Sequence, residues 1–473
     1  MMKTITHKIL VMWSIGLVLT LGGCGTTSST LALTNSSTTT STVAQAISSN
    51  ITLNDQSVSI TQPGTYTLNG TISNGQVIVD VWEGNEARLQ LAGVDITSKG
   101  SSPILIKSGK ATIELVSGTS NTLTDSVYNE NADENATIYA EEDLVIEGEG
   151  NLKINANGND GITSKDDLTI KSWNIEVQAA DDGIRGKDSL TIDGGKINVI
   201  AGGDGLKSDH ETKGSIVMNA GEVSISAGSD GAEAYKTITI NGGKLKILKS
   251  YEGLESEVVT INDGEISIVS SDDGINISDS SSTASEGMMH RNGTASGRIL
   301  TINGGKIMID VGADGLDSNG AIEMNGGTVV IFGPTDNGNA ALDYDETFTV
   351  NGGTLLAFGS NGMAMNVSSG NQNSVLIGLS SQQNAGAKFS LVDSNGNTIL
   401  EVTPTKAWSS VVVSTAGLKL NSEYRYLVDG VEAGSFTLTS SVMSAGTSWG
   451  MMWGHGGMWG GRPSGTPPQR LSW

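Results

Sequence analysis

The chain has 473 residues, of which 63 are glycine and 7 are proline; aromatic residues make up 4%, and the formal net charge is −24. So few aromatic residues exclude one large aromatic core, and apolar burial must instead be spread over many thin layers of small and aliphatic side chains. The strong negative charge argues against a nucleic-acid partner and against direct binding to anionic lipid headgroups, but it suits divalent cations.

The N-terminus has the pattern of a bacterial lipoprotein signal. Lys3 and Lys8 precede a short apolar run, residues 9–21, which is too short to cross a bilayer comfortably. Leu21-Gly22-Gly23-Cys24 then resembles a lipobox, in which the cysteine thiol receives a diacylglycerol, and Cys24 is the only cysteine. We therefore expect a signal peptide at 1–24 and a secreted protein that is lipid-anchored at the bacterial cell surface, with no other membrane contact.

Residues 25–49 are almost entirely Ser, Thr and Ala, which predicts a flexible linker. Beyond the linker, a repeat of about 22 residues determines the expected fold. Each unit is marked by a seed, in which an acidic residue precedes glycine and a small or branched apolar residue. The seed acids are Asp160, Asp182, Asp204, Asp230, Glu252, Asp273 and Asp314.

Each unit contains three short β-type runs separated by glycine-rich turns. In one unit these runs are Gly183–Arg185, Leu190–Ile192 and Lys196–Ile200. A stack of hairpins is the competing fold, because Asn-Gly pairs favour hairpin turns. A hairpin meander has a two-strand period, however, and no segment has the apolar pattern of a helical crossover. We therefore predict a parallel β-helix whose successive coils are about 4.8 Å apart.

The flanking segments complete the predicted organisation. The β-helix is expected over residues 50–370, with a loop inserted at 279–297. Residues 371–440 lose the period and alternate over longer runs, which predicts a small antiparallel β cap on the open end of the helix. Residues 441–473 are rich in Gly, Met and Trp, and we expect a disordered tail.

Stacking converts each repeat position into a column of side chains. The seed acids would lie about 5 Å apart, which demands either hydrogen bonds to their own turns or a bound cation. Two residues after each seed glycine, an outward column is expected. It contains Thr163, Arg185, Lys207, Glu233, Glu255, Asn276, Asp317 and Asp343.

Clusters of carboxylates in these columns match the six to eight oxygen ligands of Ca²⁺. The candidate calcium ligands are Asp181, Asp182, Asp204, Asp230, Glu233, Asp272, Asp273, Asp314 and Asp317. Arg185 and Lys207 are the only basic members of the outward column, and we expect them to contact an acidic ligand.

The repeated Asp-Gly-[Ile/Leu]-x-Ser, followed by Leu-Thr-Ile-x-Gly-Gly-Lys-Ile, resembles a family of clostridial-type secreted carbohydrate-binding proteins. The resemblance is strongest from Asp182 to Ala201 and from Asp204 to Ser208. It implies a right-handed, pectate-lyase-like β-helix, bound calcium, and cellulose or acidic polysaccharide as the partner.

Three functions fit these observations. The first is a non-catalytic, calcium-dependent module that binds cell-wall polysaccharide. The second is a polysaccharide lyase, which the resemblance permits, with Lys207 or Arg185 removing a proton from a calcium-bound uronate. A lysine base needs a depressed pKa, however, and the surrounding acids would raise it. The third is a passive surface spacer or adhesin with no ligand.

Overall fold

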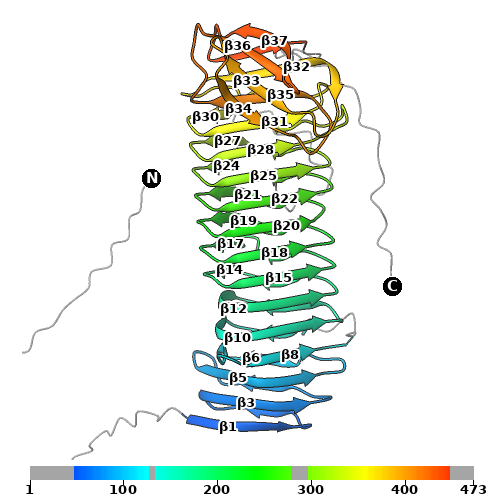
Figure 1. Cartoon of the computed structure of the whole chain (residues 1–473). Helices are drawn as coiled ribbons and strands as arrows, with labels where there is room; N and C mark the ends of the chain where they lie inside the picture. Colours follow the sequence, from blue (N-terminus) through cyan, green and yellow to red (C-terminus); the bar gives the residue numbers. More distant parts are fainter. Residues whose placement is uncertain (1–46, 127–133, 279–296, 448–473) are drawn as a thin grey trace, which may run out of the picture. The chain divides into compact units, whose positions relative to one another are not determined.

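The structure, a computed structural model, describes residues 47–126, 134–278 and 297–447. In these ranges the chain forms strands and turns, and none of it forms a helix long and apolar enough to span a membrane. The strands stack in successive coils (Figure 1). The signal peptide with Cys24, most of the linker, nearly all of the inserted loop and most of the tail lie outside the described residues and stay predictions.

A typical coil contributes three parallel strands, and equivalent strands of successive coils pair to form three faces. The coil predicted from residues 183–200 is a representative case. Its strands are β13 (Ile184–Gly186), β14 (Ser189–Ile192) and β15 (Lys196–Ala201), each paired in parallel with the next coil. The prediction of a parallel β-helix is therefore confirmed.

Face 1 follows the seed acids, and faces 2 and 3 come next in each coil. Face 1 contains β2 (Val58–Ile60), β4 (Val77–Asp80), β6 (Ile104–Ser108), β9 (Ala136–Ala140), β11 (Asp160–Ser164), β13, β16 (Leu206–Ser208), β23 (Ile275–Ile277), β26 (Leu316–Ser318) and β29 (Leu342–Tyr344). Face 2 contains β7 (Lys110–Leu115), β14, β17 (Ser215–Met218), β24 (Ile299–Ile302), β27 (Ala321–Met324) and β30 (Phe348–Val350). Face 3 contains β8 (Ser120–Thr124), β15, β18 (Glu222–Ser226), β20 (Lys244–Lys249), β22 (Glu265–Ser270), β25 (Lys306–Val311), β28 (Thr328–Phe332) and β31 (Thr354–Gly359).

Seven longer strands continue around a corner from one face to the next. Those shared by faces 2 and 3 are β1 (Ile47–Asn54), β3 (Gly64–Ile72), β5 (Glu86–Thr97), β10 (Leu144–Ala156) and β12 (Asp167–Ala179). Those shared by faces 1 and 2 are β19 (Ala232–Ile240) and β21 (Leu254–Ile261).

The core forms because apolar residues alternate with polar ones along many of the strands, as in β14 and β15. Ile192, Ile197 and Val199 are buried, as are the residues that pair with them in the next coil, and together they continue one apolar cluster through the stack. Burying an aliphatic side chain of this size contributes about 1.5–3 kcal/mol relative to leaving it exposed. Parallel pairing needs no helical crossover here, because the other two strands of each coil return the chain to the same face.

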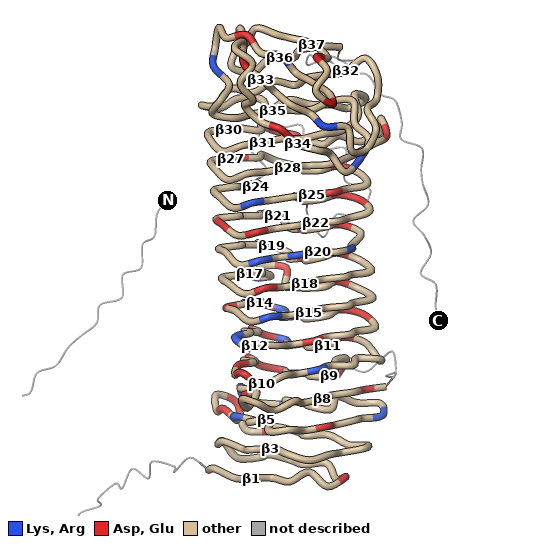
Figure 2. The backbone as a smooth tube through the Cα atoms, viewed as in Figure 1, with Lys and Arg blue, Asp and Glu red and all other residues tan. Residues whose placement is uncertain are grey.

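Face 3 also carries a column of alternating charge on its outer surface. In register order the column contains Lys196, Glu222, Lys244, Glu265 and Lys306, and basic and acidic residues follow one another along this part of the stack (Figure 2). The ammonium of Lys244 lies 2.9 Å from the carboxylate of Glu265. Exposed pairs of this kind contribute about 0–1 kcal/mol each, so they favour the register more than they stabilise the fold.

Two kinds of glycine position the coils, for different reasons. The second glycine of each Gly-Gly corner has a positive φ, which is 88° at Gly195. The seed glycines have no such φ. A Cβ atom on Gly205 would instead lie 2.3 Å from a methyl carbon of Ile225 and 2.6 Å from the carbonyl oxygen of Gly231 in the next coil. The seed glycine is therefore required by the close approach of neighbouring coils.

We predict that Gly205→Ala destabilises the protein by about 1–3 kcal/mol, because the added methyl group overpacks the contact between coils. Gly194→Ala is the matched control, since a Cβ atom there has no other atom within 4 Å. The free energies of unfolding of the two variants should be compared by denaturant titration. An unchanged stability of Gly205→Ala would contradict this explanation of the seed glycine.

The predicted cap covers the last coil. β35 (Trp408–Thr415) pairs antiparallel with both β31 and β32 (Ser374–Gln383). A separate antiparallel sheet contains β34 (Thr398–Val402), β33 (Phe389–Asp393), β36 (Glu423–Val428) and β37 (Val431–Thr437), in that order. Phe358 of the last coil packs edge to face against Phe389 and Trp408, with ring centroids 5.7 Å and 5.2 Å apart, so the cap has its own aromatic core against the open end.

Two strands extend into segments that were expected to be unstructured, the linker that ends at residue 49 and the tail that begins at residue 441. β1 begins at Ile47, inside the expected linker, because its residues pair in parallel with β3. β38 (Val442–Gly446) lies in the expected tail and pairs in parallel with β32. The described fold is therefore longer at both ends than the periodicity alone indicated, since strand pairing does not require the repeat motif.

Candidate functional site

Face 1 places the outward column in register. Cα pairing aligns Arg185 with Lys207, Lys207 with Glu233, and Glu233 with Glu255. The same column continues through Asn276 to Asp317. The seed acids precede each of these strands, so they form a second column beside the outward one. We call the two together the acidic column.

The seed acids hold neighbouring coils together. One carboxylate oxygen of Asp182 accepts a hydrogen bond from the backbone N–H of Asp204 at 2.9 Å, and Asp204 accepts one from Asp230 at 2.9 Å. Equivalent bonds join Asp160 to Asp182, Asp230 to Glu252, and Asp273 to Asp314. The expectation that each acid bonds its own turn is therefore wrong at these positions, because the next coil offers a better-placed backbone donor.

The first part of the acidic column is neutralised by basic side chains. The ammonium of Lys207 contacts a carboxylate oxygen of Asp204 and lies 3.5 Å from Asp182 and 3.3 Å from Glu233. Burial alone would raise the pKa of Asp204, but the charge of Lys207 outweighs it and lowers that pKa below its usual value. Arg185 similarly pairs with Asp209 and lies 3.9 Å from Asp160.

The next coils contain acids that have no lysine or arginine partner among the described residues. Carboxylate oxygens of Asp230, Glu252 and Glu255 lie within 4.8 Å of one another, and so do those of Glu252, Asp272 and Asp273. In the described part of the chain, none of these five acids forms an ion pair with lysine or arginine. Burial, followed by the charges of neighbouring acids, raises the pKa of Glu252 to about 9 and the pKa values of Asp230 and Asp273 to about 8.

Asn276 adds a neutral oxygen to this group. Its side chain is 9% exposed, and its amide nitrogen donates a hydrogen bond to Glu252 at 2.9 Å. When Glu252 is ionised, as it would be beside a bound cation, this bond determines the orientation of the amide, since an ionised carboxylate can only accept. The amide oxygen is buried and has no hydrogen-bond partner among the described residues. A buried amide oxygen that lacks a donor, on a side chain that is bonded to Glu252, is suited to a Ca²⁺ ion.

The structure brings most predicted metal ligands together, but in different groups. Asp204, Asp230 and Glu233 form one group, and Asp273, Asp314 and Asp317 form another. Asp272 joins Glu252, whereas Asp182 is near Lys207. Asp181 is exposed and belongs to none of these groups.

Sequence reasoning omitted Glu252, Glu255 and Asn276 from the candidate ligands. All three occupy the predicted columns, so the repeat register contained the signal that could have identified them.

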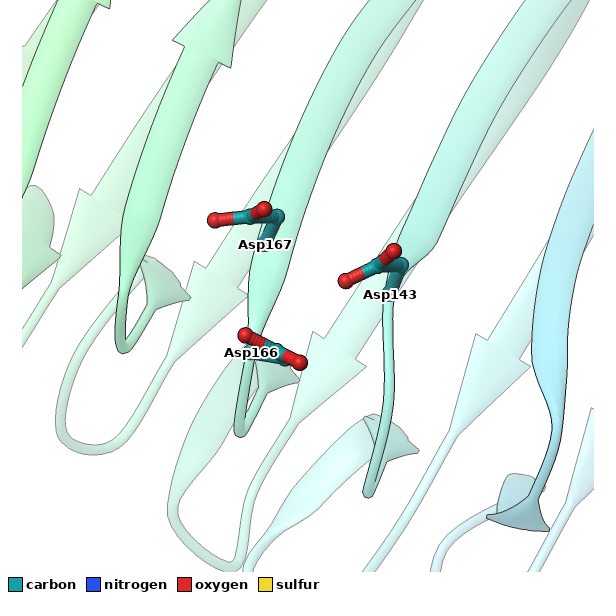
Figure 3. Close-up of side chains that lie close together, drawn as sticks. All are labelled: Asp143, Asp166 and Asp167. Atoms are coloured by element: carbon teal, nitrogen blue, oxygen red, sulfur yellow. The ribbon is translucent and has the colours of Figure 1, made fainter. Parts of the chain in front are cut away.

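A further acidic cluster lies at the turns that follow face 1. Figure 3 shows Asp143 on one turn, with Asp166 and Asp167 close by, and their carboxylate oxygens lie within 4.8 Å of one another. A hydrogen bond with Asp188, followed by burial, raises the pKa of Asp166 to about 6. This cluster already has cations, because Lys110 contacts Asp143 and Lys213 contacts Asp188. Its acids directly precede the register-paired Leu144 and Leu168 of two successive coils, so the repeat register contained a signal for this cluster as well.

The fold and site together define a parallel β-helix with a column of outward acidic groups along one of its corners. The sequence profile of a family described as "Carbohydrate-binding domain-containing protein" matches residues 54–338. The chain belongs to this family.

Two similar proteins come from one clostridial species. A curated "Carbohydrate-binding domain-containing protein" from Acetivibrio thermocellus is 41% identical over 135 residues. The match covers 27% of this chain and 47% of the relative, so the chain spans about half the length of the relative. A solved structure described as a polysaccharide lyase-like protein from C. thermocellum, a gadolinium derivative, is 38% identical. That match covers 45% of this chain and 84% of the other, with a TM-score of 0.38.

Proposed function

We propose that this protein binds an acidic cell-wall polysaccharide of the polyuronate type through Ca²⁺ and does not cleave it. The observation that supports this proposal is the group formed by Asp230, Glu252, Glu255 and Asn276, which collects buried and half-buried oxygens without a lysine or arginine partner among the residues that the structure describes. Family membership supports a carbohydrate partner.

A bound cation resolves an electrostatic problem in this group. Without one, burial and mutual repulsion disfavour the charged carboxylates, as the raised pKa values of Glu252 and Asp230 show. Ca²⁺ accepts carboxylate and amide oxygens in a flexible arrangement of six to eight ligands. With one oxygen from each side chain the group supplies four ligands, so positions remain for water or for a sugar carboxylate. A polyanion could then bind to a protein whose net charge is −24.

The structure does not favour the lyase alternative at the residues predicted for it. A general base must be unprotonated near the working pH. Burial alone would lower the pKa of Lys207, but the charges of Asp204, Asp182 and Glu233 raise it well above its usual range. The charge of Asp209 similarly raises the pKa of Arg185, although burial opposes it.

We predict that polygalacturonate resin retains the protein in millimolar Ca²⁺ and releases it when a chelator is added. The ultraviolet absorbance of an unsaturated uronate product should not increase during incubation. Glu252→Gln combined with Glu255→Gln should abolish retention. Glu222→Gln combined with Glu265→Gln is the matched control, since it removes two exposed acids from face 3.

Two results would contradict this proposal. Absorbance that grows with protein concentration and disappears in Lys207→Ala would establish a lyase. Absence of retention on polygalacturonate and on cellulose, with and without Ca²⁺, would leave a passive surface spacer as the remaining function.

A further inference from the structure

Tyr251 is the residue before the seed acid Glu252 and is unlike its counterparts in the other coils. The equivalent positions hold Asp181, Gly203, Ser229, Asp272 and Ala313. Tyr251 is therefore the one aromatic residue in this set, and its side chain is 50% exposed. A half-exposed aromatic ring at this point needs an explanation, since an aromatic side chain contributes most to stability or binding when its apolar surface is buried.

The acidic group holds Tyr251 in place. Its backbone carbonyl accepts a hydrogen bond from the N–H of Asp272 in the next coil at 2.9 Å. The interaction of its hydroxyl with the carboxylate of Asp272, followed by burial, raises the pKa of Tyr251 to about 12. The carboxylate of Asp272 lies within 4.8 Å of those of Glu252 and Asp273. Tyr251 is thus held beside the acids of the proposed cation site by its backbone bond to Asp272, while about half of its surface remains in contact with solvent.

Two exposed aliphatic side chains lie on the strands that lead into the same turns. Leu248 in β20 is 57% exposed and Val269 in β22 is 44% exposed. Each follows a buried isoleucine, and these isoleucines, Ile247 and Ile268, are paired in register. Leu248 and Val269 therefore lie on neighbouring coils, and each lies three residues before Tyr251 or its counterpart Asp272. We call Leu248, Tyr251 and Val269 the apolar strip.

A ligand that covers both the apolar strip and the acids must have an apolar surface and a charged or polar edge. A pyranose ring satisfies this requirement, because its faces present C–H groups and its rim carries oxygens. In a uronate ring, one of those rim groups is a carboxylate, which a shared cation would join to the acids. A wholly apolar partner would leave the acids without compensation, and a wholly polar one would not cover the strip.

We propose that the apolar strip is a sugar-binding subsite in which the ring of Tyr251 contacts the C–H face of a uronate residue whose carboxylate is directed to the neighbouring acidic group. This inference rests on the proposed function and assigns the subsite that determines affinity for the pyranose ring. Tyr251 binds the sugar, and Asp272 positions Tyr251.

The experiment measures the affinity of purified protein for a galacturonate oligosaccharide by calorimetry in millimolar Ca²⁺. Tyr251→Ala should weaken binding about five- to tenfold, because the contact area of the ring is lost. Tyr251→Phe should remain within about twofold of the unsubstituted protein, since the ring is retained. Trp173→Ala is the matched control, as Trp173 is 67% exposed but lies at the corner between faces 2 and 3. The rise in unfolding temperature caused by Ca²⁺ should be the same in all four proteins.

The outcomes separate this inference from the proposed function. Binding by Tyr251→Ala with unchanged affinity would overturn the subsite and leave calcium-dependent binding intact. An equal loss in Tyr251→Phe and Tyr251→Ala would also overturn it, because the hydroxyl and not the ring would then be the contact. Failure of the unsubstituted protein to bind the oligosaccharide would overturn the proposed function, and the subsite with it.

Discussion

Millimolar Ca²⁺ should raise the unfolding temperature of the protein, and a chelator should remove the increase. The group of Asp230, Glu252, Glu255 and Asn276 exists only in the folded chain, because its members come from three successive coils. A ligand that binds only the folded state stabilises it by about 2.7 kcal/mol at a hundredfold excess over Kd. For a chain of this size we expect an increase of about 3 °C, measured by differential scanning calorimetry.

Paired substitutions of acidic residues should show which group binds the ion. Glu252→Gln combined with Glu255→Gln should remove most of the increase while retaining side-chain volume and the acceptor for Asn276. The exposed pair Glu222→Gln and Glu265→Gln should retain it. Asp182→Asn combined with Asp204→Asn would be a poorer test, because it leaves the buried ammonium of Lys207 with fewer carboxylates and destabilises the fold without involving calcium.

Identical melting curves in chelator and in Ca²⁺ would eliminate a calcium role for the described residues. An increase that survives in the Glu252 and Glu255 variant would place the ion elsewhere, and the cluster of Asp143, Asp166 and Asp167 would be the next group to test.

The calcium-free protein should become less stable as the pH rises from about 5 to about 9. Unfolded Asp and Glu lose their protons near pH 4, whereas burial and neighbouring charges raise the folded pKa of Glu252 to about 9 and of Asp230 and Asp273 to about 8. Between these limits the folded state retains protons that the unfolded state has lost, so the free energy of unfolding falls with pH. This stabilisation is complete below about pH 4 and is lost as the pH passes through the folded pKa values.

Calcium should oppose this pH dependence. The ion replaces the protons on the same carboxylates, so its affinity should increase with pH and its binding should release protons. Unfolding temperatures recorded across the pH range, with chelator and with Ca²⁺, should therefore diverge most near pH 9. Glu252→Gln should reduce the slope in chelator. A stability that is flat or rises over this range in chelator would show that these acids are ionised without a cation.

The sequence alone determined the stacking of the fold because its repeat is strict. A seed, a Gly-Gly corner and three alternating runs recur at a near-constant spacing, and only a coil of parallel strands returns each position to the same face. The outward column from Arg185 through Asp317 follows from that register alone, and the structure confirms it residue by residue.

The tertiary structure decided what the columns do. Spacing in the sequence cannot show that a seed carboxylate accepts a hydrogen bond from a backbone N–H of the next coil, or that Lys207 contacts acids of three coils, since these depend on the direction and reach of each side chain. It also cannot show the buried oxygen of Asn276 or the half-exposed ring of Tyr251 beside the acids. The repeat places these groups on neighbouring coils, but rotamers, burial and the local competition for donors determine which acids are already satisfied and which require a cation.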